Sequence, residues 1–97
     1  MSALTLKIVT PDGNDRVISC DSVTLWMSAD SKGRQEGSIG IRKGHTEAVI
    51  ALGNGPLEAH QEGKLIFSAR SEGGFATVLN DTITVITNHL TENSSDL

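Results

Sequence analysis

Short runs of alternating apolar and polar residues, each closed by turn-forming residues, constrain this chain more than any other feature of its sequence. Residues 4–9 alternate and stop at the turn-forming segment 10–13, and residues 23–27 place alternate apolar side chains on one face. Residues 64–70 and 75–79 repeat the pattern. A period of two is that of a β-strand, and no run carries the period of a convincing amphipathic helix. The pattern predicts an all-β fold.

Two local segments sharpen this prediction. The apolar run 48–52 is too short to distinguish strand from helix by its period. We expect a strand, because the turn-forming residues 53–56 follow at once and leave no room for a useful helix. The alternating runs 75–79 and 82–87 flank the pair Asn80–Asp81, which tolerates positive φ, so we expect a β-hairpin there.

The length of 97 residues limits the chain to a single domain. Many short strands at close spacing, separated by polar turns, are typical of a β-sandwich or a β-barrel. Residues 91–97 contain one apolar residue, so we expect a disordered tail after a domain that covers residues 1–90.

The charge of the chain is −4, with eight basic and twelve acidic residues, which argues against nucleic acid as a partner. Half of the cations, Lys32, Arg34, Arg42 and Lys43, lie within twelve residues. A basic loop on an acidic body suggests contact with an acidic or carbonyl-rich surface, although a solvated loop is the simpler alternative. Because no apolar run is long enough to span a membrane and no signal peptide is present, we expect a soluble cytosolic chain.

The titratable residues suggest no active site. His45, His60 and His89 lack metal-ligand spacing, and His60 with Glu62 would give only two ligands on one face of a strand. A lone Cys20 beside apolar residues is more often a small buried hydrophobe than a nucleophile, and it has no cysteine partner for a disulfide. The glycines form neither a dinucleotide-binding nor a P-loop motif. We therefore expect no enzyme activity, no metal and no cofactor.

Trp26 is the chain's only tryptophan, and its role stays open at this level. Alternation points it away from Val23, Leu25 and Met27. It could cover a sheet, or it could anchor an interface, where tryptophan is common.

Four segments, in order, resemble the ε subunit of F-type ATP synthases, whose mitochondrial counterpart is called δ. Residues 6–13 resemble its opening strand and turn, and residues 21–25 its next strand. Residues 36–45 are similar to the central E-G-x-x-G-[IVL]-x-P-G-H motif, and residues 72–85 to a G-G-F-x-x-V hairpin. The resemblance spans residues 4–87.

The chain departs from the family pattern around its central motif. Lys43 stands where the family usually has proline, and the pair Thr46–Glu47 replaces Ala-Pro. The loop over residues 26–35 is longer than usual by several residues. The contacts of this loop are therefore expected to differ from those of the family.

The resemblance implies an antiparallel β-sandwich of about ten short strands. Many relatives also carry a C-terminal helical hairpin for ATP sensing and inhibition, and we expect none here because the given sequence stops soon after its last predicted strand. It implies a non-catalytic rotor subunit of the central stalk that joins the γ subunit to the c-ring and couples ion translocation to ATP synthesis or hydrolysis. Such a subunit would be peripheral, on the cytoplasmic face of an energy-transducing membrane, and would bind no ATP.

By the same resemblance, two groups of residues would form the interfaces. The residues expected to face the c-ring are Glu36, Gly37, Ser38, Ile39 and Arg42, and those expected to lie near γ are Lys43, His45 and Glu47. The competing hypothesis is a free-standing β-sandwich module that binds protein and has kept the fold but not the complex.

Overall fold

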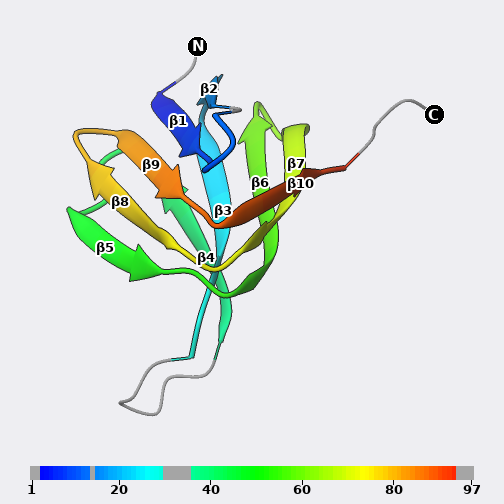
Figure 1. Ribbon diagram of the computed structural model, residues 1–97. Coiled ribbons are helices and arrows are strands. Elements are labelled where there is room, and N and C mark those ends of the chain that lie inside the picture. Colours follow the sequence, from blue (N-terminus) through cyan, green and yellow to red (C-terminus); the bar gives the residue numbers. More distant parts are fainter. Residues whose placement is uncertain (1–2, 14, 30–35, 94–97) are drawn as a thin grey trace.

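The computed structural model describes residues 3–13, 15–29 and 36–93, which form two packed five-stranded sheets (Figure 1). The first sheet has the order β2 (Arg16–Cys20), β1 (Leu4–Val9), β9 (Thr82–Ile86), β8 (Phe75–Leu79), β5 (Ala48–Ala51). The second has the order β10 (His89–Glu92), β7 (Lys64–Glu72), β6 (Asn54–Gln61), β3 (Ser22–Met27), β4 (Gly37–Arg42). The ten strands, with no helix in the described ranges, confirm the all-β sandwich.

One strand pair departs from the expected antiparallel arrangement. β1 and β9 pair in parallel, with Thr5 beside Thr82 and Val9 beside Ile86, whereas the other ladders are antiparallel. Parallel neighbours need a long connection, and here most of the chain lies between the two strands.

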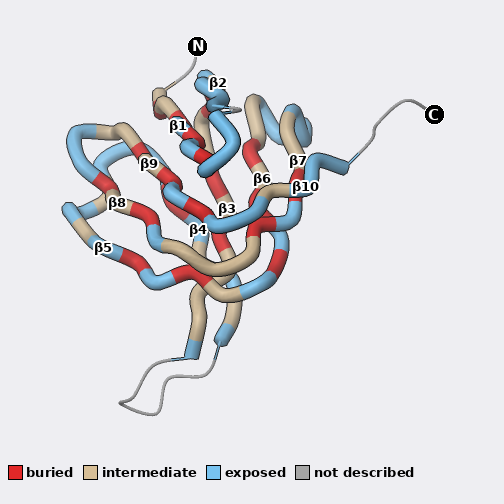
Figure 2. The backbone as a smooth tube through the Cα atoms, in the orientation of Figure 1, coloured by how far each residue is buried: buried red, intermediate tan, exposed pale blue. Residues whose placement is uncertain are grey.

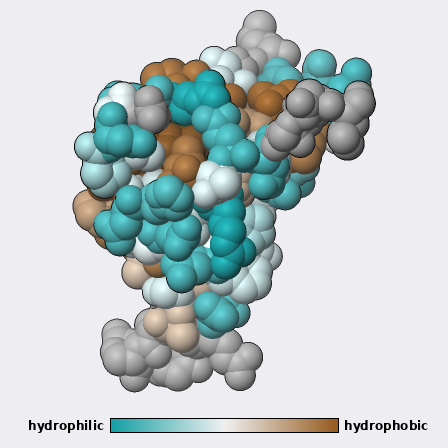
Figure 3. Space-filling view, turned by 45° about the vertical axis from the view of Figure 1, so that its right-hand side comes forward, coloured by the Kyte–Doolittle hydropathy of each residue, from teal (hydrophilic) through white to brown (hydrophobic). Residues whose placement is uncertain are grey.

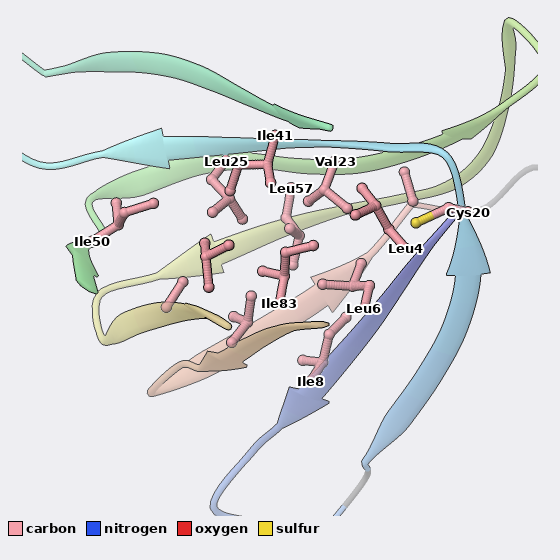
Figure 4. Close-up of a cluster of buried hydrophobic side chains, with 14 of the residues drawn as sticks. Leu4, Leu6, Ile8, Cys20, Val23, Leu25, Ile41, Ile50, Leu57 and Ile83 are labelled. Carbon is pink, nitrogen blue, oxygen red and sulfur yellow. The ribbon is translucent and has the colours of Figure 1, made fainter. Parts of the chain in front are cut away.

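The core lies between the two sheets and is built from alternate residues of their strands (Figures 2 and 4). The largest fully buried aliphatic side chains are Leu6, Ile8, Val23, Leu25, Ile41, Leu57, Ile83 and Val85. Each sheet therefore has one sealed inner face and one outer face, so a partner can meet only the outer faces, the sheet edges and the turns.

Both local predictions are confirmed. Residues Ala48–Ala51 form a strand, β5, rather than a helical turn. Asn80 and Asp81 have φ values of 50° and 59°, so they form the left-handed turn that joins β8 to β9.

β6 begins earlier than expected, at Asn54, so residues 54–56 are strand rather than turn. Pro56 pairs with Arg70 of β7, while the ladder of β6 with β3 ends at Thr24 and Glu58. Proline has no N–H to donate, and Pro56 lies beyond the end of the ladder with β3, so the strand tolerates it.

The tail begins later than expected, because Thr91 and Glu92 belong to β10 and pair with Arg70 and Ala69 of β7. The free edge of β7 supplies backbone partners that the sequence of residues 91–92 does not reveal. Residues 94–97, the rest of the expected tail, lie outside the described residues.

The alternation of residues 64–70 also breaks, because the register of β6 and β7 shifts between Ala59 and His60. Ile66 is the extra residue of this bulge, and both Leu65 and Ile66 are exposed.

Two connections between the sheets, from β7 to β8 and from β9 to β10, are held together at one end of the sandwich. The buried hydroxyl of Thr87, which follows β9, lies 3.3, 3.0 and 3.1 Å from the carbonyl oxygens of Glu72, Gly73 and His89. Gly74 has a φ of 94°, and a Cβ there would lie 2.0 Å from the Ile86 carbonyl oxygen. The two connections fit together only because residue 74 has no side chain.

We expect Gly74→Ala to lower the free energy of unfolding by about 3 kcal/mol or more, because it adds both backbone strain and a clash with the Ile86 backbone. The control is Gly13→Ala, which has a φ of 80° but no atom within 4 Å of its new Cβ, and should cost about 1 kcal/mol. Urea denaturation measures both losses, and equal losses would contradict the account of these connections.

Candidate functional site

The expected interface residues lie along one edge of the sandwich. Glu36 precedes β4, and the residues Gly37, Ser38 and Ile39 form its first half. Arg42 ends the same strand, about 17 Å from Gly37 and about 10 Å from Ile39 at about 3.3 Å per residue. The structure therefore separates Arg42 from the other four residues of its expected group. It brings Arg42 together with the second group, Lys43, His45 and Glu47, in the turn to β5.

The turn that follows β4 has the geometry for which the family motif uses proline. The His45 amide donates to the Arg42 carbonyl over 3.1 Å, and Gly44 has a φ of 84°. These are the features of a type II turn with Lys43 at the position that proline favours and Gly44 at the position that needs positive φ. The sequence has lost the proline, but the turn is retained.

One side chain ties this turn to the opposite sheet. The Gly44 amide donates to the Asp81 carboxylate over 2.8 Å, and Asp81 belongs to the hairpin turn between β8 and β9. The turn after β4 and the hairpin of the first sheet therefore form one end of the sandwich. The ring of His45 also contacts its neighbour, with Nδ1 2.8 Å from the Thr46 carbonyl oxygen.

The cations of this edge have no acidic partner in the part of the chain that the structure describes. Arg42 and Lys43 are exposed, and the one ion pair among the described residues joins Arg16 to Glu92. The other two cations of the expected basic loop, Lys32 and Arg34, lie outside the described residues. Arg42 and Lys43 thus remain available for an acidic partner.

Trp26 lies on the outer face of the second sheet, over a glycine of the neighbouring strand. A Cβ on Gly55 would lie 2.3 Å from Cγ of Trp26, and one on Gly53 would lie 3.2 Å from its Cδ1. The indole N–H donates to the Glu36 carboxylate over 3.4 Å. Trp26 therefore covers its own sheet, the first of the two roles left open by the sequence, and it is half-buried there.

The outer face of the first sheet is a feature that the motifs did not reveal. The cross-strand row Val9, Ile86, Phe75 and Ala51 runs over four strands, and its first three side chains are 37%, 40% and 43% exposed. Val49 in the adjacent row is 76% exposed. Alternation marks these side chains as outward-facing, but only the strand register aligns them into one band. In Figure 3, patches of apolar surface, in brown, lie exposed among the hydrophilic residues, in teal.

The first-sheet outer face carries no acidic residue. Its thirteen outward-facing residues are Thr5, Lys7, Val9, Val17, Ser19, Val49, Ala51, Phe75, Thr77, Leu79, Thr82, Thr84 and Ile86. The outer face of the second sheet is different, since it presents Arg42, Glu58, Arg70 and Glu72. In a chain with twelve acidic residues, a face with an apolar band, one lysine and no acid is suited to a partner rather than to water.

A shallow pocket joins this face to the turn after β4. Its volume is about 430 Å³, and it is lined by Glu47, Ala48, Val49, Thr77, Val78 and Leu79. Glu47, expected near γ, therefore lies at the margin of the first-sheet outer face.

The remaining candidate groups show no arrangement for chemistry. Glu62 lies in a turn with a φ of 52°, so it does not share a strand face with His60. Burial raises the pKa of the Cys20 thiol, and the charge of Asp21 adds to this effect, so the thiol stays protonated. Within the described ranges, no group of three or more His, Cys, Asp or Glu side chains could hold a metal ion. Nor do these ranges contain a helix long and apolar enough to cross a membrane.

The chain matches known proteins over nearly its whole length. Residues 3–93 match the family model of the ATP synthase delta/epsilon chain β-sandwich domain. The ATP synthase epsilon chain of a Synechococcus strain is 34% identical over 85 residues, and that of Granulibacter bethesdensis is 27% identical over 86 residues. These matches cover 88% and 89% of this chain but only 56% and 58% of the relatives, so the chain spans little more than half their length.

Two solved structures share the fold. A chain of the Euglena gracilis mitochondrial ATP synthase, solved with its c-ring, superposes with a TM-score of 0.72 at 22% identity, over 95% of this chain and 54% of that one. A chain from the central stalk and c-ring of the Tetrahymena thermophila mitochondrial ATP synthase has a TM-score of 0.65 at 15% identity, over 91% of this chain and 65% of that one.

We expect Lys43→Pro to raise the free energy of unfolding by about 0.4–1 kcal/mol, because proline fits this turn position and restricts the unfolded chain. Lys43→Ala, which removes the charge without restricting φ, should change stability by less than about 0.5 kcal/mol. Thermal and urea unfolding measure both changes. A loss of stability in the proline variant would show that residues 42–45 do not form the type II turn.

Proposed function

Because the chain belongs to the delta/epsilon β-sandwich family of ATP synthases, we propose that it is a non-catalytic subunit in the central stalk of an F-type ATP synthase. In this role it joins the γ subunit to the c-ring and couples ion translocation to ATP synthesis or hydrolysis. Its relatives are ATP synthase epsilon chains, and the solved structures with its fold come from assemblies that contain the c-ring.

The observation that carries the proposal is the first-sheet outer face. An apolar band over four strands would be costly to leave in water. The single charged residue of the whole face, Lys7, lies in the row next to this band. We assign this face to the γ subunit. The turn with Lys43, His45 and Glu47 continues the same surface through the pocket beside β5, as an interface near γ requires.

The opposite end of β4 is then left for the ring. Glu36, Gly37, Ser38 and Ile39 lie at the start of this strand, next to the long loop. Arg42, expected on the ring side by resemblance, goes instead with the γ side, because it lies about 17 Å along the strand. The two partners would thus meet opposite ends of one strand.

A close-packed sandwich between two partners transmits force without chemistry of its own. Its inner faces are sealed by side chains that are almost completely buried, and such cores resist deformation. We propose that the subunit is peripheral to the energy-transducing membrane, on its cytoplasmic face. We further propose that it holds no cofactor and binds no ATP.

We expect Ile86→Glu to weaken binding of the chain to purified γ subunit at least about tenfold, or about 1.4 kcal/mol, because it buries a carboxylate in the apolar band. Ile66→Glu is the matched control: Ile66 is 46% exposed, against 40% for Ile86, but lies at the bulge of the second sheet. Titration calorimetry measures both affinities, and circular dichroism checks that both variants fold.

Equal loss of affinity in the two variants would remove the assignment of γ to the first-sheet outer face. If the unmodified chain fails to bind γ and is also missing from ATP synthase purified from its own membranes, the free-standing binding module replaces the stalk subunit.

A further inference from the structure

The two sides of the sandwich end differently. On one side, the edge strands β2 and β10 are linked by the hydrogen-bonded ion pair of Arg16 and Glu92, in which Arg16 Nε donates to Glu92 Oε2 over 2.8 Å. The carboxylate raises the pKa of the Arg16 guanidinium, mainly through the hydrogen bond. On the other side, the edge strands are β4 and β5, and no ion pair within the described residues links them.

The backbone of β4 presents half of its hydrogen-bonding groups to this open side. The bonds Gly53 N–H to Trp26 O and Ser28 N–H to Ala51 O, both 3.0 Å, show that Trp26 and Ser28 direct their backbone groups away from β4. Since these groups alternate along a strand, Leu25 and Met27 direct theirs toward β4.

The register then identifies the free groups of β4. The partners of Leu25 and Met27 are Ile39 and Gly37, so these two residues make the ladder bonds to β3. Ser38 and Gly40 direct their N–H and C=O groups outward, where no described strand pairs with them.

Nothing among the described residues protects this edge from pairing. β4 runs in unbroken register against β3, without a bulge or a proline. A Cβ on Gly37 or on Gly40 would meet no atom within 4 Å, so another backbone can approach closely. Natural edge strands usually carry a bulge, a proline or a central charge that prevents such pairing.

The ends of the edge specify what could pair with it. Inward-facing Ile41 is buried and Ile39 is half-buried, so an added strand would place apolar side chains beside them. At the far end, Arg42 and Lys43 lack a carboxylate partner among the described residues.

We propose that β4 extends its sheet with an extended segment of the γ subunit, held by backbone hydrogen bonds to Ser38 and Gly40. Ser38 and Ile39 then pass to the γ side, and only Glu36 and Gly37 stay with the ring. The segment is apolar where it lies beside Ile39 and Ile41 and carries a carboxylate where it reaches Arg42 and Lys43. This inference rests on the proposed function, and it adds the mode of recognition: strand addition at the edge, next to the contact with the first-sheet outer face.

The test uses proline at Ser38. Ser38→Pro removes an N–H that only an added strand would use. Ser38 is exposed, and its N–H belongs to no ladder among the described residues, so the variant should fold and melt like the unmodified chain.

ATP synthase is purified from membranes of cells that produce the variant or the unmodified chain, and the chain retained is quantified. We expect the retained amount of Ser38→Pro to fall at least fivefold below that of the unmodified chain. Hydrogen exchange on the unmodified chain needs no variant: the Ser38 and Gly40 amides should exchange fast in the free chain and become protected in the complex.

Full retention of Ser38→Pro, or unchanged fast exchange of both amides in the complex, would overturn strand addition while leaving the stalk role intact. Absence of the unmodified chain from the complex would instead overturn the stalk role and the inference with it. A free chain that elutes as a dimer with these amides already protected would also overturn the inference, since a second copy would then occupy the edge.

Discussion

Everything in this molecule depends on closing one core between two sheets with side chains of period two. Face-to-face sheets pack about 10 Å apart, so a chain of 97 residues can seal the space with alternate aliphatic residues and needs no helix. The sealed inner faces take up Leu6, Ile8, Leu25, Ile41 and Ile83. The apolar residues that the core does not use are then the informative ones, and Val9, Ile86 and Phe75 gather in one row on the first sheet.

That distribution connects packing to function. The acid-free outer face of the first sheet and the open edge at β4 adjoin each other through the turn of residues 43–47, which Asp81 fixes to the first sheet. The other side, bridged by Arg16 and Glu92, and the charged outer face of the second sheet are compatible with water. The proposed rotor role would need this division, because such a subunit must hold its partners firmly on some surfaces and face solvent on the rest.

Local chemistry made much of the fold predictable. The positive φ values of Asn80 and Asp81 followed from their residue types. The strand over Ala48–Ala51 followed from the turn-forming residues that come directly after it. The features missed by the sequence analysis depend on partners distant in the chain. Pro56 is tolerated because the ladder between β6 and β3 ends before it, and Glu92 belongs to a strand because β7 offers a free edge. The parallel pairing of β1 with β9 depends on the long stretch of chain that connects the two strands. The candidate site behaved in the same way: the motif located β4 and its turn, whereas the edge position of β4 and the band around Phe75 required the register.

The central claim is a mechanical link between ion flow and the catalytic subunits, and ATP-driven ion pumping tests it most directly. Membrane vesicles from cells that lack this chain should still hydrolyse ATP but should fail to build an ion gradient. Adding the purified chain should restore the gradient. Vesicles that pump equally well with and without the chain would contradict the account.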